Sequence, residues 1–164
     1  MQNNLYVVGG LSRVGKGKVA ARMKERDASL EAFSTDQFRP SGDNEQAWLN
    51  IIDFIERRQF TSDVIIEGIA ISPQKVHGLE LNNLKVKRVA FIGYSNESHA
   101  DFVLAHAAQA KNADWVYSGM QAGRISEQEV RGWTKSGIPE SAKLRTEAET
   151  YGYAYFDVTA CPFD

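Results

Sequence analysis

The chain has 164 residues, of which 43% are hydrophobic and 24% charged, and its formal net charge is −2 at pH 7. This length and composition predict one globular domain that buries a core of its own. The near-neutral charge argues against a general binder of nucleic acid or of anionic membrane surfaces.

The chain contains no sequence that we expect to direct it to or across a membrane. Its first ten residues have no basic region followed by a long apolar run, and no stretch approaches the roughly 20 apolar residues of a membrane helix. The single cysteine, Cys161, cannot form an internal disulfide, which fits a reducing compartment. We therefore expect a cytoplasmic protein with no membrane partner.

Strand-like and helix-like segments alternate along the chain. We expect strands at 5–8, 30–34, 63–67, 88–92 and 153–158. We expect helices at 16–26, 45–58, 73–81 and 140–151, and a further helix that is capped by residue 95 or 96 and runs to about 110. The clearest helix carries Trp48, Ile51, Ile52 and Ile55 at spacings of three and four residues. The alternation predicts an α/β fold with a parallel sheet and helices on both faces, in which ligands bind at the carboxyl ends of strands.

The first such end carries the spacing G-x-x-x-x-G-K, between a predicted strand and a predicted helix. Glycines let the backbone curl so that its N–H groups point at phosphate oxygens, and the helix N-terminus adds a positive dipole. The plainer alternative is a glycine-rich turn. In its strand-to-helix context we interpret the motif as a nucleotide site formed by Gly10, Leu11, Ser12, Arg13, Val14, Gly15, Lys16, Gly17 and Lys18.

Gly17 follows the loop lysine where a Ser or Thr usually ligates Mg²⁺, and Lys18 comes next. Loss of both hydroxyls weakens direct ligation by the loop, so water-mediated holding of Mg²⁺ is the alternative. Ser12, inside the loop, is a less suitable source of a hydroxyl ligand for Mg²⁺. This leaves Asp36 and Glu67 as the metal candidates.

Asp36 lies at the expected end of the second strand, in STDQFRP. A carboxylate there can take the proton of an acceptor hydroxyl that attacks the γ-phosphate, and Arg39 can clamp an anionic acceptor. The alternative is that Asp36 caps a helix and Arg39 is a solvated charge. Glu67 directly follows the third apolar run, where an acid orders the water shell of the metal; otherwise it is a strand-end glutamate in solvent.

Together GGLSRVGKGK, STDQFR and VIIEGIAISP resemble the small-molecule kinases of the P-loop superfamily. The pattern is most similar to the 2-phosphoglycerate kinase-like group, with zeta-toxin and chloramphenicol phosphotransferase-like enzymes close to it, and the GKG resembles adenylate kinases. The motifs cover roughly residues 5–75. The resemblance implies a three-layer fold with a five-stranded parallel sheet, ATP as donor and a mobile lid. It implies Lys16 as phosphate ligand, Asp36 as base, Arg39 as acceptor contact, and an adenine position near Thr159 and Ala160.

The polar segment 114–137 stands where such kinases carry their lid. It holds Arg124 and Arg131, seven apart, as candidate catalytic residues that neutralise the γ-phosphate; the alternative is solvated arginines. We expect Trp115 and Trp133 to pack.

We make two further predictions, for Arg145 and for the three histidines. We expect Arg145 to pair with Glu149 rather than to reach the phosphates. His99 and His106 are expected on a solvated helix face, and with His77 they have no zinc-site spacing.

Our hypothesis from the sequence is a Mg²⁺- and ATP-dependent phosphotransferase acting on a small-molecule acceptor. One alternative is a nucleoside monophosphate kinase, suggested by GKG. Another is a nucleotide-binding module that has lost turnover, suggested by Gly17 and Lys18, with the Lys18 cation in the place of the metal.

Overall fold

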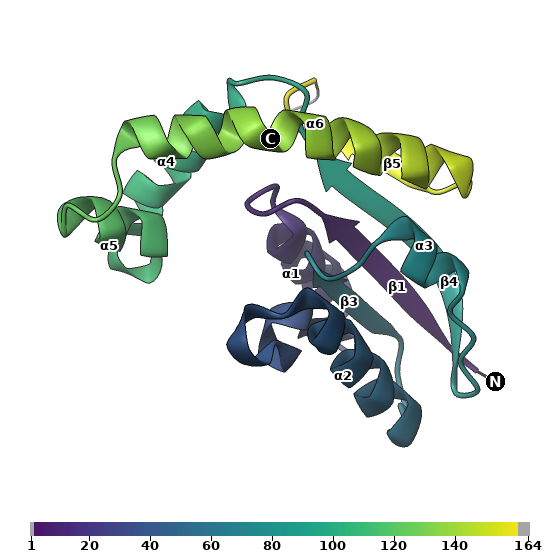
Figure 1. Cartoon of the computed structure of the whole chain (residues 1–164). Helices are drawn as coiled ribbons and strands as arrows, with labels where there is room; N and C mark the ends of the chain where they lie inside the picture. The colour runs from purple at the N-terminus through teal and green to yellow at the C-terminus, as the bar shows by residue number, and fades with distance from the viewer. Residues whose placement is uncertain (1, 161–164) are drawn as a thin grey trace.

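A computed structural model describes residues 2–160 of the chain, and its centre is one five-stranded parallel sheet (Figure 1). The strand order is β2-β3-β1-β4-β5, and each neighbouring pair is parallel. The strands are β1 (Asn3–Gly10), β2 (Glu31–Ser34), β3 (Val64–Gly68), β4 (Leu84–Gly93) and β5 (Ala154–Asp157). The five-stranded parallel sheet predicted from the sequence is confirmed.

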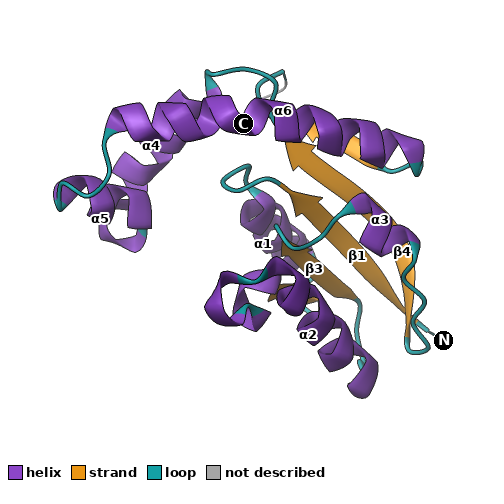
Figure 2. Ribbon diagram, viewed as in Figure 1, coloured by secondary structure: helices purple, strands orange, loops and turns teal. Residues whose placement is uncertain are grey.

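Helices surround the sheet (Figure 2). They are α1 (Lys16–Arg26), α2 (Asn44–Arg57), α3 (Pro73–His77), α4 (His99–Ala110), α5 (Trp115–Gln121) and α6 (Glu127–Thr150), with short 3₁₀ turns η1 (Thr35–Phe38), η2 (Pro40–Gly42) and η3 (Lys111–Ala113). None of the helices within residues 2–160 combines the length and apolar character that crossing a bilayer requires.

The alternation of side chains along β1 divides the core between the two faces of the sheet. Leu5 and Val7 join a cluster that contains α2 residues such as Ile51. Val8 joins a second cluster that contains Ala20 of α1. Burial on both faces explains why the central strands are continuous apolar runs, and it fixes the register that sets where each strand ends.

The strand order places the end of β1 at the centre of the sheet, with β3 on one side and β4 on the other. Val8 lies opposite Glu67 of β3, and Ser34 at the end of β2 lies opposite the same glutamate. Residues that follow β1, β2 and β3 therefore share one edge of the sheet. This is the edge at which the loop and the two acids were expected to meet.

The structure differs most from the prediction in the last long helix. We expected it to begin at residue 140, but α6 begins at Glu127, where Ser126 and Glu129 form a capping box. The candidate lid segment, residues 114–137, therefore consists of α5, a turn and the first half of α6. It has a small core of its own, in which Val116 and Val130 pack against Val103 of α4.

Candidate functional site

The loop from Gly10 to Lys16 joins β1 directly to α1. Gly10 has φ +143°, and a Cβ at this position would collide with the backbone of Ile92 in β4, so the sheet requires glycine here. Gly15 precedes α1 with φ 89°, and no side chain caps the helix. The first N–H groups of α1 are therefore left to face the loop, as a phosphate site requires.

Lys16 lies inside this loop and is only 7% exposed. Its ammonium donates a hydrogen bond to the Leu11 carbonyl oxygen. Burial lowers the pKa of Lys16 to about 8, while the negative charges of Glu67 and Asp36 oppose that shift. The lysine thus sits between the loop backbone and the two acids that the sequence proposed for metal binding.

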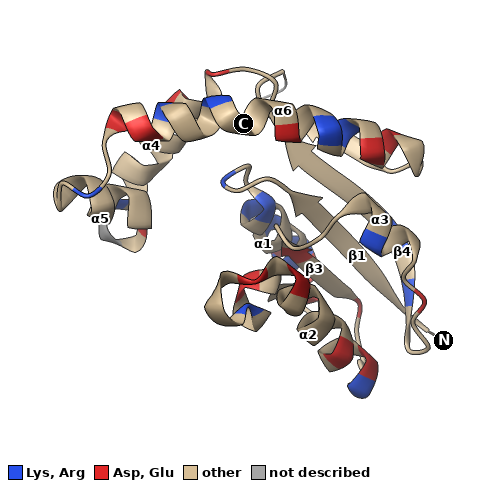
Figure 3. Cartoon of the chain, viewed as in Figure 1, with Lys and Arg blue, Asp and Glu red and all other residues tan. Residues whose placement is uncertain are grey.

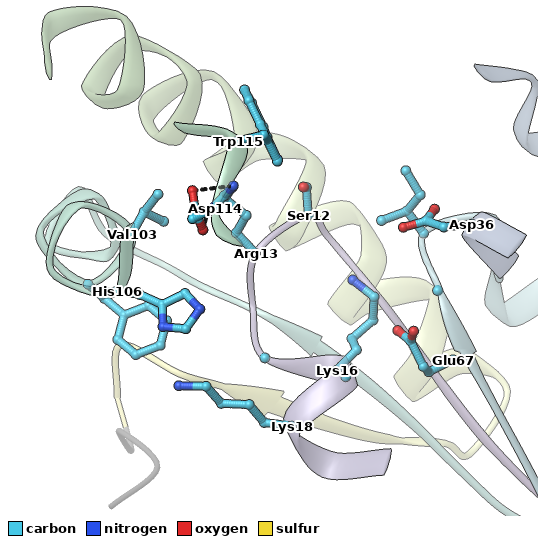
Figure 4. Close-up of a pocket in the computed structure, with 15 residues that line it drawn as sticks. Ser12, Arg13, Lys16, Lys18, Asp36, Glu67, Val103, His106, Asp114 and Trp115 are labelled. Atoms are coloured by element: carbon cyan, nitrogen blue, oxygen red, sulfur yellow. Dashed lines mark hydrogen bonds and ion pairs between the residues drawn. The ribbon is translucent and has the colours of Figure 1, made fainter. Parts of the chain in front are cut away.

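A cavity of about 370 Å³ opens beside the loop and brings several segments of the chain together (Figure 4). Figure 3 shows basic positions in the loop and at the start of α1, and acidic positions near β3 and α2. The lining comes from the loop and α1, from the ends of β2 and β3, and from α4 and α5: Ser12, Arg13, Gly15, Lys16, Gly17, Lys18, Asp36, Glu67, Gly68, Ile69, Phe102, Val103, His106, Asp114 and Trp115.

The two acids reach the cavity from adjacent strands. Glu67 is the next-to-last residue of β3, and Asp36 lies in η1 directly after β2. Gly68 has φ +152°, and a Cβ there would collide with the buried Thr35, so glycine allows β2 and β3 to end side by side. Ser34, and not Asp36, caps η1, because its hydroxyl accepts from the Asp36 N–H at 3.3 Å. The Asp36 carboxylate is 69% exposed.

These two carboxylates fit Mg²⁺, which proteins commonly hold with one or two carboxylates together with substrate phosphates and water. Within residues 2–160, no group of three or more His, Cys, Asp or Glu side chains is placed to hold a metal by itself. The donor set therefore suits an ion that arrives with a nucleotide better than one bound by the protein alone.

Arg39 lies beside Asp36, with Nη1 3.6 Å from the carboxylate Oδ1. It does not line the cavity. It lines a separate, open pocket with Phe38 and Asn50. Its charge is thus directed at Asp36 in this conformation.

Arg13 is the loop residue whose structural role the sequence did not reveal. It has φ 61°, and its guanidinium makes two hydrogen bonds to Asp114, at 2.9 and 3.1 Å. Asp114 is only 7% exposed and also caps α5 by accepting from the Val116 N–H. The guanidinium carbon lies 4.7 Å from the centre of the Trp115 ring. Burial opposes ionisation of Asp114, but the Arg13 hydrogen bonds and the cap hold its pKa below the usual value.

Lys18 extends away from the two acids toward α4, as Figure 4 shows. Its ammonium lies 5.5 Å from the ring centre of Phe102, which stacks at 6.3 Å on His106 one helical turn later. The cation that replaces the usual hydroxyl is therefore at the α4 side of the cavity. We had not proposed Phe102 or His106 for the site; their spacing of four residues on a predicted helix was the available signal.

The candidate lid arginines lie outside the cavity. Arg131 is paired with Glu127 at 2.7 Å and with Asp101 at 2.9 Å. Arg124 is exposed and does not line the cavity. The Lys and Arg side chains that line it in the described part of the chain are Arg13, Lys16 and Lys18, all from the loop and the start of α1.

Three further expectations had mixed outcomes. The Arg145–Glu149 pair is confirmed at 2.8 Å. The solvated position expected for His99 is wrong: the side chain is 2% exposed, because it stacks on Tyr94 at the end of β4. Trp115 and Trp133 contact each other, with ring centres 5.9 Å apart, but remain 57% and 45% exposed, so they are only partly packed.

Two other expectations are not tested by the structure. The adenine position near Thr159 stays a prediction, and Cys161 lies outside the described residues.

No family model matches the sequence, and no curated protein matches it. Among solved structures, the chain is similar to shikimate kinase from Bacteroides thetaiotaomicron, with a TM-score of 0.55 and 14% identity, over 94% of this chain and 86% of that one. A gluconokinase from Sinorhizobium meliloti 1021 aligns with a TM-score of 0.45 and 15% identity, over 92% and 98% of the two chains. The first likeness shows that the chain shares the fold of that shikimate kinase, with a five-stranded parallel sheet and surrounding helices.

Proposed function

We propose that this protein is an ATP-dependent kinase that phosphorylates a hydroxyl group of a small molecule. One observation carries the proposal: a single cavity joins the phosphate-binding loop and its buried Lys16 to two carboxylates, Asp36 and Glu67, at the ends of adjacent strands. Phosphoryl transfer needs this combination of cations, backbone donors and an acid beside the γ-phosphate. The fold shared with shikimate kinase, a small-molecule kinase by name, agrees with it.

In the proposed reaction, the loop N–H groups and Lys16 bind the β- and γ-phosphates. An acceptor hydroxyl oxygen forms a bond to the γ-phosphorus while the bond from that phosphorus to the β,γ-bridging oxygen breaks, and ADP leaves. Asp36 accepts the hydroxyl proton, for which its exposed carboxylate at the cavity is suited. Bound Mg²⁺ supplies charge neutralisation on the phosphates, and Glu67 and Asp36 are the residues we assign to hold it or its water shell.

The position of Lys18 favours a kinase over a module that has lost turnover. That alternative placed the Lys18 ammonium where the metal binds. The ammonium instead lies over Phe102, so it leaves the region of Glu67 and Asp36 open for a metal ion. Lys16 and Lys18 supply the cavity with positive charge from the loop and the start of α1, whereas Arg13 is paired with Asp114 and Arg131 with Glu127 and Asp101.

The test separates nucleotide binding from transfer. Thermal shift is first measured with ATP and ADP, with and without Mg²⁺, because a ligand that binds the folded chain raises its melting midpoint. ATP consumption is then measured with a panel of hydroxylated acceptors for the wild type, Asp36→Asn and the control Asp53→Asn. Asp53 is an exposed residue of α2 paired with Arg57.

We expect Asp36→Asn to keep the ATP-induced shift and to lose turnover by roughly 100-fold or more, as removal of a general base does. The control should match the wild type. Absence of a shift with any nucleotide contradicts the proposal. Turnover by Asp36→Asn within a few-fold of the wild type shows that Asp36 is not the base.

A further inference from the structure

A second cavity, of about 300 Å³, lies between the phosphate-binding loop and α6. It shares four lining residues with the cavity of about 370 Å³ beside the loop, which we call the phosphate cavity: Ser12, Arg13, Val103 and Trp115. A molecule bound here therefore adjoins the proposed position of the nucleotide phosphates. Apart from the loop residues, the proposed reaction uses nothing in this second cavity.

Aromatic side chains from several segments form much of its wall. Tyr94 follows β4 and stacks on His99 of α4, with ring centres 4.2 Å apart and planes 16° from parallel. Gly137 of α6 leaves the space for Tyr94, since a Cβ there would collide with the tyrosine hydroxyl. Trp115 and Trp133 add two half-exposed indole rings from α5 and α6. Such a wall suits an organic ligand with an apolar body.

His99 contributes a polar but uncharged group. It is 2% exposed, and among residues 2–160 neither of its ring nitrogens makes a hydrogen bond of good geometry, although the backbone of Arg13 lies close enough to oppose part of the pKa shift. Burial lowers the pKa of His99 to about 4, so the ring is neutral at physiological pH. The histidine therefore brings an aromatic ring and no positive charge to the cavity wall.

One uncompensated negative charge remains at this cavity. Arg13 is the single Lys or Arg among its described lining residues, and its charge is balanced by the two hydrogen bonds to Asp114. Glu140 also lines the cavity and has no ion-pair partner in the described part of the chain. Burial is the main cause that raises the pKa of Tyr94, and the negative charge of Glu140 is the second. The Glu140 carboxylate therefore lies near the aromatic wall.

We propose that this aromatic cavity binds the organic part of the acceptor, and that the acceptor is an amino alcohol carrying an ammonium group. The inference rests on the proposed kinase function. Aromatic faces attract cations, most strongly those of tryptophan, and a carboxylate adds a charge-assisted hydrogen bond. An anionic acceptor would meet Glu140 and no free cation in the described lining, since Arg13 is already paired.

This assignment replaces the anionic acceptor that we had expected from Arg39. Arg39 is directed at Asp36, but Arg39 itself lines neither the phosphate cavity nor the aromatic cavity. A third opening, beside Leu11 and Ile69, also contains Glu140, and its one lysine, Lys143, has its ammonium 3.7 Å from the Glu147 carboxylate. The surroundings of α6 thus present carboxylates and paired cations to an incoming molecule.

The experiment uses pairs of hydroxylated probes that differ mainly in charge: tyramine and 4-hydroxyphenylacetate, ethanolamine and glycolate, glucosamine and glucuronate. Binding is followed by tryptophan fluorescence at saturating ADP and Mg²⁺, and turnover by ATP consumption. The proteins are the wild type, Glu140→Gln and the matched control Glu149→Gln. Glu149 is an exposed residue of the same helix, paired with Arg145.

We expect the amine of at least one pair to bind tenfold or more tightly than its acid, and to be the better substrate. Glu140→Gln should weaken amine binding by about ten-fold, which corresponds to roughly 1.4 kcal/mol, with ATP binding unchanged. Glu149→Gln should behave as the wild type.

Three results overturn the inference: binding or turnover only of acids or neutral molecules, equal amine binding by Glu140→Gln and the wild type, or no response to any probe from a protein that binds ATP. Each leaves the proposed kinase function standing. Loss of nucleotide binding itself contradicts the proposed function instead, so the two failures are distinguishable.

Discussion

The guanidinium of Arg13, in the loop between β1 and α1, binds the carboxylate of Asp114 at the start of α5 through two hydrogen bonds, at 2.9 and 3.1 Å (Figure 4). The two residues are 101 positions apart in the chain. The same carboxylate caps α5, so a single buried group joins the loop to the candidate lid segment. The conformation of the loop and the position of α5 are therefore energetically coupled.

The first prediction concerns this pair. Arg13→Ala leaves a buried carboxylate without its charge partner, and Asp114→Asn keeps the helix cap but removes the charge. We expect each change to lower the free energy of unfolding by about 1–3 kcal/mol. The double variant should lose less than the sum, with a coupling energy of about 1–2 kcal/mol in urea denaturation. Strict additivity would show that the contact contributes nothing of its own.

The second prediction concerns the charge of Lys16 and its dependence on pH. Burial lowers its pKa from 10.5 to about 8 in the folded protein. Between these two values the unfolded chain binds more protons at this group, so its contribution to the free energy of unfolding rises as the pH increases. We expect the Lys16 contribution to this rise in the free energy of unfolding to be absent in Lys16→Met. Urea denaturation of the variant and the wild type from about pH 8 upward measures it.

Phosphate binding should raise the pKa of Lys16 that burial lowers, because anions favour the protonated form of the lysine. ATP affinity should therefore fall as the pH rises above about 8, and binding near that pH should take up protons. Calorimetry in buffers of different ionisation enthalpy measures the uptake. An ATP affinity that does not change across this range would mean that the Lys16 ammonium does not bind the phosphates.

Much of this architecture follows from local sequence signals. The helix predicted at 16–26 matches α1 in both bounds, because a strand, a glycine and a dense polar-apolar pattern define it locally. The strands also matched to within a few residues, since burial on both faces makes them continuous apolar runs. The parallel topology alone predicted the edge of the sheet at which the candidate residues Lys16, Asp36 and Glu67 lie.

Other features depend on contacts between distant segments. The first half of α6 was missed, because Gly132, Gly137 and Pro139 interrupt a segment with little apolar periodicity. The burial of His99 arises from stacking on Tyr94, which no local pattern announces. The Arg13–Asp114 pair was invisible for the same reason, and it gives Arg13, proposed only as a nucleotide contact, a second role as a link between the loop and α5.

The third prediction tests Glu67 as the residue that holds the metal or its water shell. Glu67→Gln keeps the shape of the side chain but removes its charge. We expect the Mg²⁺ concentration for half-maximal turnover to rise by about ten-fold, as is typical when an outer-shell metal partner is lost. The control is Glu56→Gln, an exposed residue of α2. An unchanged Mg²⁺ requirement with normal ATP binding would assign the metal to Asp36 alone.

The fourth prediction compares two glycines of the loop region that look equivalent in the sequence. Gly10 has φ +143°, and a Cβ on it would meet the backbone of Ile92, which cannot move without disturbing the β1–β4 pairing. Gly17 lies inside α1, and a Cβ on it would project into open space, with no atom beyond its own helix backbone and chain neighbours within 4 Å. Gly10→Ala should therefore lower the free energy of unfolding by about 1–3 kcal/mol, through overpacking and backbone strain.

Gly17→Ala should instead raise the free energy of unfolding by about 0.5–1 kcal/mol, because alanine is the better helix former and meets no neighbour. Urea denaturation of both variants without nucleotide measures the difference directly. Similar destabilisation by the two changes would mean that the loop tolerates no side chain at all. Opposite signs would show that the sheet contact at Ile92 makes glycine necessary at Gly10, whereas folding does not require the glycine that replaces the usual hydroxyl at Gly17.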